Sequence, residues 1–210
     1  MPRPPSTALR QRPAFAKVAM AFRVGATDQA GPKVIETTRL KLHHFADHHR
    51  SPFAEMHADP EVMADLGGPI DNVESDLKFA RYLAAQAEHG VARWAVEDVN
   101  GNFLGYSGVM PRMDPKHPLG SHYEVGWRFR RAAWGNGYAV ESARAALSHA
   151  IHDIRLDQIL SYTSGDNLRS QSVMRKLGLV RDSSRDFTIR TSRPWQGLVW
   201  LVPVGSWPRS

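Results

Sequence analysis

The stretch EVGWRFRRAAWGNGYAVE, residues 124–141, decides how this chain is organised. It begins as an extended apolar run, passes through a loop containing Gly135, Asn136 and Gly137, and continues into a helix. At such a junction several backbone N–H groups lack partners and point one way, with the positive end of the helix dipole behind them. The pattern fits an anion-binding loop, although tight turns use the same residues.

Two common phosphate-binding loops do not fit this stretch. A dinucleotide-binding fold needs a third glycine where no glycine occurs here, and its loop opens a βαβ unit rather than following antiparallel strands. A Walker loop needs Gly-Lys-Ser/Thr, which is absent. The loop therefore belongs to another type of anion site or to a simple turn.

Composition indicates one globular domain with a basic tail. The chain has 210 residues, 42% hydrophobic residues, six Trp and no Cys, which excludes disulfides and thiol catalysis and fits a cytoplasmic protein. Residues 1–33 carry six basic side chains and one acid, whereas the remaining 21 basic and 20 acidic residues nearly cancel. We therefore predict a flexible basic extension over residues 1–32 and a single domain over 33–210.

Hydrophobic periodicity and turn residues predict the order of the elements. Strands are expected at 39–45, 93–97, 103–110, 122–129, 158–163, 179–191 and 197–203, and helices at 47–58, from 60, 72–89, 137–153 and 167–177. Several strands follow one another without an intervening helix. The order predicts a mixed α/β sheet layered with helices rather than a doubly wound fold.

The opening stretch resembles motif A of the GNAT acetyltransferase superfamily, most closely the RimJ/RimL branch of ribosomal-protein N-terminal acetyltransferases. That branch reads approximately E-[IV]-G-Y-W-L-x-P-x-x-W-G-x-G-Y-A-x-E-A. The matching residues are Glu124, Val125, Gly126, Trp134, Gly135, Gly137, Tyr138, Ala139 and Glu141. Arg128 and Arg131 depart from the usual Trp and Pro.

Two further blocks resemble the same family in the same order. Residues 161–179 resemble the segment ending N-x-x-S-x-x-x-x-x-K-L-G-F, with Asn167, Ser170, Lys176, Leu177 and Gly178 matching. Residues 36–42, ETTRLKL, resemble the family's E-T-x-R-L-x-L start. The resemblance spans about residues 34–203.

The resemblance implies a mixed, mostly antiparallel sheet that splays between its fourth and fifth strands, with helices on both faces and acetyl-CoA in the gap. The pantetheine arm would pair with the backbone of the fourth strand, and the pyrophosphate would meet the loop amides. The implied CoA-binding residues are Trp127, Arg128, Phe129, Arg130, Arg131, Trp134, Gly135, Asn136, Gly137, Tyr138, Ala139, Asn167 and Ser170. Asn167 equally suits a plain helix N-cap.

Acetyl transfer to an amine requires a proton acceptor and an acid for the leaving thiolate. Glu124 is the favoured base, with His122 and Tyr123 as alternatives, although a strand Glu is also often simply ion-paired. Family members often carry a Tyr acid where this chain has Met174, so Ser170 or water would protonate the thiolate.

The expected partner is a protein N-terminus or a small-molecule amine, attacked directly in a ternary complex. A non-catalytic acyl-CoA-binding module on the same fold is the alternative. A homodimer is possible, and neither a membrane nor nucleic acid is expected as a partner, because the body of the chain is nearly neutral. The pairs His43-His44 and His48-His49 do not predict a metal site.

Overall fold

The computed structural model describes residues 34–190 and 194–208. The chain divides into two units, Met1–Gly31 and Pro32–Ser210. The basic extension predicted over residues 1–32 lies outside the described residues, and the predicted domain that follows it is described here.

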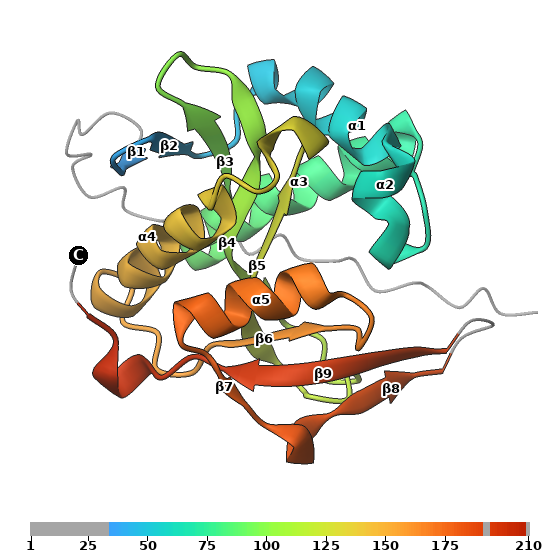
Figure 1. Ribbon diagram of the computed structural model, residues 1–210, viewed down its shortest axis with the longest axis vertical. Helices are drawn as coiled ribbons and strands as arrows, with labels where there is room; N and C mark the ends of the chain where they lie inside the picture. Colours follow the sequence, from blue (N-terminus) through green and yellow to red (C-terminus); the bar gives the residue numbers. More distant parts are fainter. Residues whose placement is uncertain (1–33, 191–193, 209–210) are drawn as a thin grey trace, which may run out of the picture. The chain divides into compact units, whose positions relative to one another are not determined.

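The second unit is built on one long mixed sheet (Figure 1). Its strands are β1 Val34–Glu36, β2 Leu40–His43, β3 Arg93–Asp98, β4 Phe103–Arg112, β5 His122–Phe129, β6 Leu160–Thr163, β7 Val180–Arg181, β8 Phe187–Ile189 and β9 Trp195–Leu201. Their order is β1-β2-β3-β4-β5-β6-β9-β7, and β8 pairs with β9. Only the β5–β6 pair is parallel among these strands. The predicted fold class is confirmed.

Helices cover both faces of the sheet. They are α1 Arg50–Ala58, α2 Pro60–Met63, α3 Asn72–His89, α4 Tyr138–His152 and α5 Leu168–Leu177, with 3-10 turns η1 Asp47–His49 and η2 Ala64–Leu66 in the first half. Asp59 caps α2 and Asp71 caps α3 through side-chain oxygens, and Gly90 and Gly178 end α3 and α5 in the left-handed conformation. These are the start and stop signals that the sequence carries.

The alternation of side chains along the strands separates two cores. Val109 and Val125 pack with α4 and α5 on one face, in a cluster that includes Leu147 and Met174. Tyr106 and Met110 face the other way and pack with aromatic residues of α1 and α3. On the β5 strand, odd-numbered side chains therefore face α4 and α5, and even-numbered ones face α1 and α3.

The sheet opens between β5 and β6. These strands share a single registered pair, Glu124 with Leu160. Just beyond it, the Ser161 hydroxyl donates a 2.8 Å hydrogen bond to the Val125 carbonyl, where a continuing ladder would place a backbone amide. From this point β5 and β6 diverge. They are the fourth and fifth strands of the predicted sheet, because the prediction did not include β1, so the expected opening lies where it was predicted.

Two predicted elements differ from the structure, and one observed strand was not predicted. The strand predicted at 179–191 is two strands, because Asp182 accepts a hydrogen bond from the Ser184 N–H and starts a 3-10 turn. Helix 47–58 begins as the η1 turn and becomes α-helical only at Arg50. The β1 strand was not predicted as an element of its own.

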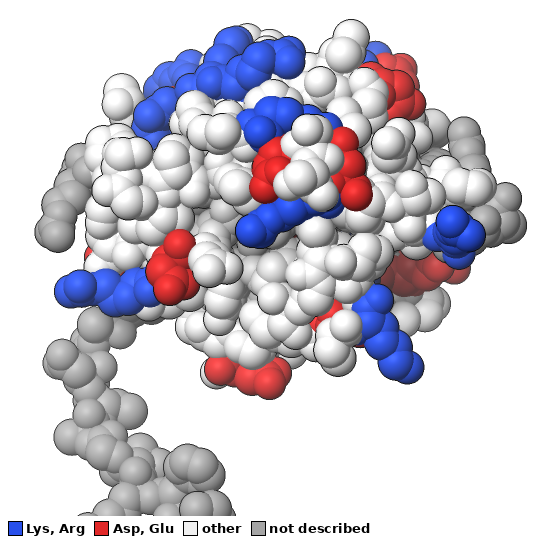
Figure 2. Space-filling model, turned by 90° about the horizontal axis from the view of Figure 1, so that it is seen from below, with Lys and Arg blue, Asp and Glu red and all other residues white. Residues whose placement is uncertain are grey.

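The surface carries both charge signs. On the face drawn in Figure 2, basic side chains gather along one margin, while the rest shows small groups of both signs among uncharged residues. Within residues 34–190 and 194–208, no helix is both long and apolar enough to cross a membrane.

Candidate active site

A cavity of about 600 Å³ lies between the diverging end of β5, the loop after it and the start of α5. Its lining includes ten of the predicted CoA-binding residues: Trp127, Arg128, Phe129, Trp134, Gly135, Gly137, Tyr138, Ala139, Asn167 and Ser170. Three blocks that are distant in sequence, 127–140, 166–176 and 61–65, therefore meet around one space.

The backbone of Trp127 is turned toward this gap. The Arg130 N–H donates to the Leu104 carbonyl of β4, and Arg128 is registered opposite Tyr106. The backbone N–H and C=O groups of even-numbered β5 residues therefore form the hydrogen bonds to β4. Odd-numbered residues turn their N–H and C=O the other way. Consistent with this, the Phe129 carbonyl accepts a 2.8 Å bond from the Trp134 ring N–H. Trp127, which lies between Val125 and Phe129, thus presents its N–H and C=O to the open side.

The glycine loop supplies backbone amides at the far end of the cavity. Gly135 and Gly137 have φ angles of 78° and 81°, which favour glycine, and Gly137 caps α4 without a side chain. The Val140 N–H bonds the Gly137 carbonyl, whereas the N–H groups of residues 137–139 precede any carbonyl of the helix that could accept from them. Asn136 is exposed, bonds the Trp134 carbonyl through its side chain, and does not line the cavity.

Glu141 ties the loop to the start of the domain. Its carboxylate accepts hydrogen bonds from the Thr37 hydroxyl (2.6 Å) and from the Arg39 N–H and side chain (3.1, 2.8 and 2.6 Å). The E-T-x-R-L block and the last Glu of motif A therefore contact each other. Together they fix the N-terminus of α4.

The arginines at the end of β5 take different positions from those expected. Arg130 and Arg131 form ion pairs of 2.7 and 2.6 Å with Glu55 and Glu61, and neither lines the cavity. Arg169 and Lys176 of α5 line it instead, and the Arg169 guanidinium lies 4.1 Å from the centre of the Trp134 ring. Sequence reasoning missed Arg169; its place next to the Asn167 cap was the available signal.

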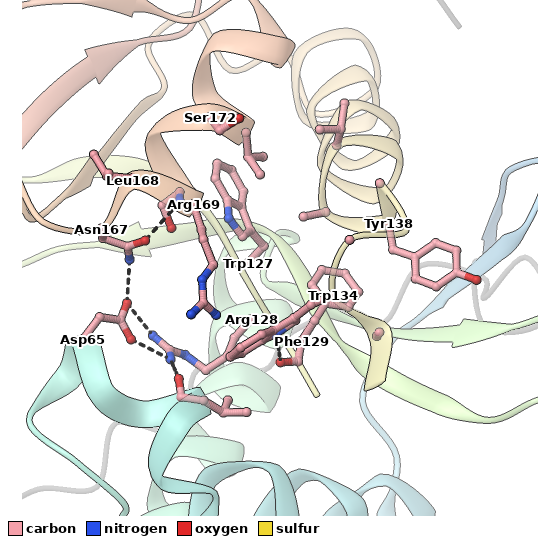
Figure 3. A pocket seen from close by; sticks show the side chains of 18 of the residues that line it. Asp65, Trp127, Arg128, Phe129, Trp134, Tyr138, Asn167, Leu168, Arg169 and Ser172 are labelled. Carbon is pink, nitrogen blue, oxygen red and sulfur yellow. Dashed lines mark hydrogen bonds and ion pairs between the residues drawn. The ribbon is translucent and has the colours of Figure 1, made fainter. Parts of the chain in front are cut away.

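Arg128 turns its side chain to the opposite face of the sheet and holds the η2 segment (Figure 3). It donates to the Val62 carbonyl and to both carboxylate oxygens of Asp65, at 2.9 and 3.2 Å. Asp65 also accepts a 2.9 Å bond from the Asn167 amide, whose oxygen caps α5 at the Ser170 N–H. Asp65 thus joins β5 to α5 across the gap.

Glu124 is buried on the α1/α3 face at the point where the sheet opens. Its Oε2 lies 2.6 Å from Arg112 Nε and 3.2 Å from Arg93 Nη2. Burial would raise the pKa of this carboxyl, but the charges of Arg112 and Arg93 outweigh burial and hold the pKa below its ordinary value. The carboxylate therefore stays ionised at neutral pH.

Gly126 leaves room for this ion pair. A Cβ on Gly126 would lie 2.6 Å from Arg93 Nη2 and 3.3 Å from Glu124 Oε1. The register Arg93–Gly108–Gly126 lets the buried guanidinium cross two strands to reach Glu124. The E-V-G spacing of the motif thus has a steric cause.

The other candidate groups lie on either side of the opening. Met174 is buried in the core and offers no proton. His122 lies on the Glu124 face beside Tyr162, with its Nδ1 2.7 Å from the Gly120 carbonyl, whereas Tyr123 packs against the core on the α4/α5 face. Burial and the Glu124 charge raise the pKa of Tyr162 well above its ordinary value.

A histidine cluster forms elsewhere on the sheet. Ligand atoms of His48, His49 and Glu97 lie within 4.8 Å of one another. The Nδ1 of His49 accepts a hydrogen bond from the Ala46 N–H, so the proton is on Nε2, which donates to Glu97 at 2.9 Å. His49 therefore has no lone pair to offer a metal in this arrangement.

Comparison with known proteins agrees with this geometry. Residues 39–180 match the family model described as an acetyltransferase (GNAT) domain. The chain belongs to the GNAT acetyltransferase family. It is an acyltransferase, and its fold is one that uses acetyl-CoA as co-substrate.

The individual relatives of this GNAT protein support its membership of the family but do not identify its acceptor. It is 29% identical to the uncharacterized protein YkkB of Bacillus subtilis over 68% of this chain and 83% of that one. It is 30% identical to an FsC-acetyl coenzyme A-N(2)-transacetylase of Aspergillus fumigatus over 70% of this chain, but only 64% of that protein is covered.

Solved structures share the fold. An acetyltransferase from Agrobacterium tumefaciens superposes with a TM-score of 0.68 at 24% identity, covering 85% of this chain and 99% of that one. A RimL ribosomal-protein acetyltransferase superposes with a TM-score of 0.65, over 85% and 98% of the two chains, at 11% identity. At that identity RimL shares the fold alone, so membership of the RimJ/RimL branch stays a prediction.

Proposed function

We propose that this protein transfers an acetyl group from acetyl-CoA to a primary amine by direct attack in a ternary complex. The observation that carries the proposal is the opening of the sheet beside Trp127. An extended backbone whose Trp127 N–H and C=O turn away from β4 lies there between a glycine loop and the buried carboxylate of Glu124. A strand-like cofactor arm and an amine can then meet from opposite faces.

The cavity fits acetyl-CoA along its length. The pyrophosphate would lie against the first-turn amides of α4, where glycines permit close approach and the helix dipole favours anions. Arg169 and Lys176 supply positive charge on the α5 side, and Asn167 and Ser170 supply polar groups. The pantetheine amides would pair with the backbone of Trp127.

The acetyl carbonyl would accept a hydrogen bond from the Trp127 N–H as negative charge develops on its oxygen. The amine nitrogen attacks the carbonyl carbon, the C–S bond breaks, and CoA leaves as a thiolate. With Met174 buried in the core, Ser170 or solvent protonates that thiolate.

We assign Glu124 to the amine. Its lowered pKa makes it a weak base toward a free ammonium group, so its role is to hold the amine and relay the proton released as the C–N bond forms. Oε1 lies over Gly126, beside the opening, whereas Arg93 and Arg112 hold Oε2. In this proposal Oε1 would meet the amine while the arginines hold Oε2; Glu124 itself does not line the CoA cavity.

The acceptor is a protein N-terminus, as in the RimJ/RimL branch, or a small-molecule amine, as suggested by a relative named as an N(2)-transacetylase. We retain cytoplasmic location and a homodimer as expectations from the sequence.

Thiol release from acetyl-CoA tests the proposal when it is measured against a panel of peptide N-termini and small amines. We expect amine-dependent release together with mass addition of one acetyl group to the acceptor. Tight acetyl-CoA binding without acetylation of any amine would overturn the proposal and leave an acyl-CoA-binding module.

A further inference from the structure

A second hollow lies on the α1/α3 side, between the end of α2 and α3. Its volume is about 570 Å³, and it shares no lining residue with the CoA cavity. Met63, Leu66, Ile70 and Leu77 give it an apolar wall, and Glu74, Lys78 and Arg81 provide its charges. It therefore suits a ligand with an apolar body and at least one charged group.

Lys78 connects this hollow to the interior of the α1/α3 face. It is half-buried, and it has no carboxylate partner among the described residues. Its charge acts on Tyr106 of β4 and on His57 of α1. Burial lowers the pKa of Lys78, as expected for an ammonium group that lacks a counter-ion.

The region beneath the hollow has an excess of positive charge. Arg93 and Arg112 share the single carboxylate of Glu124, and Arg128 pairs with Asp65. With Lys78, Arg81 and Glu74 at the hollow itself, five cations therefore face three carboxylates on this side of β5.

His57 carries no charge that would change this excess of positive charge. Its Nδ1 lies 2.8 Å from the Phe53 carbonyl, and burial together with the Lys78 charge lowers its pKa to about 4, so it is neutral. Two polar atoms here have no hydrogen-bond partner among the described residues, the Nε2 of His57 and the Nε of Arg128, although the Arg128 side chain is only 10% exposed. Because the neutral His57 ring gives its Nδ1 proton to the Phe53 carbonyl, its Nε2 is an acceptor and does not attract an anion. The unpaired Nε donor of Arg128 and the Lys78 ammonium group are the groups that favour a ligand bringing negative charge.

We infer that the acceptor amine carries an anionic group, a carboxylate or a phosphate, and that Lys78 recognises it from the wall of this hollow. The inference rests on the proposed acetyl transfer. The apolar part of the acceptor lies against Met63, Ile70 and Leu77, and its amine extends toward Glu124 at the opening of the sheet. Acceptors with several positive charges are disfavoured by the same excess.

A matched set of amines tests this inference in the full chain. The probes are 4-(aminomethyl)benzoate, its neutral benzamide, the corresponding phosphonate and the dicationic p-xylylenediamine, with CoA release as the readout. We expect kcat/KM to be at least about tenfold higher for an anionic probe than for the benzamide, the size of one charge-assisted hydrogen bond. The carboxylate and phosphonate arms distinguish the two kinds of anion.

Variants assign the preference to one side chain. Lys78→Met should abolish the preference, and Lys78→Glu should shift it toward the diamine. Lys41→Met, at a similarly half-buried lysine of β2, is the control and should retain the preference. Equal rates for acid and amide, or a preference unchanged in Lys78→Met, overturns the inference.

Calorimetry on the CoA-bound protein separates this inference from the proposed function. Lys78-dependent binding of the benzoate without CoA release supports the anion site and counts against acetyl transfer. Turnover of neutral and cationic amines at equal rates counts against the anion site and supports acetyl transfer. If no probe binds and none is turned over, the inference fails.

Discussion

Replacing Gly126 with Ala tests the steric basis of the buried ion pair. The new methyl group would lie 2.6 Å from Arg93 Nη2 and 3.1 Å from the guanidinium carbon. An ordinary contact needs at least 3.4 Å, so the guanidinium must move by about 0.8 Å, the difference between 3.4 and 2.6. Gly126 does not have a left-handed φ, so backbone strain does not enter.

The expected loss of stability follows from the hydrogen bonds and the ion pair that the Arg93 guanidinium forms. It donates to the Gly108 carbonyl and, at 2.8 Å, to the Glu124 carbonyl, and it pairs with the Glu124 carboxylate at 3.2 Å. Hydrogen bonds from charged groups contribute about 1.5–3 kcal/mol each, and Gly→Ala alone stabilises by about 0.4–1 kcal/mol through the unfolded chain. Loss of one to two of these bonds therefore predicts a net loss of about 0.5–5.5 kcal/mol in the free energy of unfolding.

Urea unfolding followed by Trp fluorescence measures this loss, and CoA release measures the effect on activity. Gly205→Ala is the matched control, because it also lacks a left-handed φ and its added Cβ meets nothing within 4 Å. It should unfold like the parent or slightly later. If Gly126→Ala behaves like Gly205→Ala in both assays, the proposed packing of Arg93 over Gly126 is wrong.

Three further predictions concern groups around the opening. Glu124→Gln should lower kcat for acetyl transfer by about a hundredfold or more with little change in acetyl-CoA affinity, as measured by calorimetry and CoA release; equal kcat values would remove Glu124 from the reaction. The folded-state pKa of Glu124 is lowered, so the stabilisation by its ion pairs is complete above about pH 4.5 and is lost as the pH falls through the folded pKa. The difference in unfolding free energy between the parent and Glu124→Gln should therefore be constant at pH 6–8 and shrink below pH 4.5. A difference that stays constant down to pH 3 would contradict the ion pairing. Asp65→Asn should lower the free energy of unfolding in urea by about 1–3 kcal/mol, because it weakens the hydrogen bonds to Arg128 and Asn167, and Asp114→Asn, in an exposed loop, is the control; equal midpoints would show that Asp65 does not join β5 to α5.

The sequence predicted the sheet, its helices and the order of the elements because local signals agree with the fold. Asp59 and Pro60 start α2, Asn167 caps α5 and Gly178 ends it. The late strands were predicted less well. The break at Asp182 depends on one side-chain hydrogen bond that periodicity does not show.

The direction of side chains across the sheet was harder to predict. The resemblance placed Arg130 and Arg131 at the CoA phosphates and Arg128 in the strand segment that pairs with pantetheine. In the structure Arg128 turns to the other face, and its neighbours pair with Glu55 and Glu61 of α1 and α2. Strand alternation predicts that adjacent residues face opposite ways, but it does not show which carboxylates distant in sequence meet them.

The buried environment of Glu124 also depends on register. Its spacing from Gly126 was visible in the sequence, whereas the two arginines that hold it come from β3 and the end of β4. Their convergence requires the pairing Arg93–Gly108–Gly126, which no local pattern encodes.

The crystal structure of the full chain with acetyl-CoA tests the central claim most directly. We predict the pyrophosphate against the amides of residues 135–139, the pantetheine arm paired with the backbone of Trp127, and the acetyl carbon at the opening of the sheet, facing Glu124 across Gly126. An acetyl group pointing away from Glu124, or a CoA molecule bound outside the cavity between β5 and α5, would contradict the account.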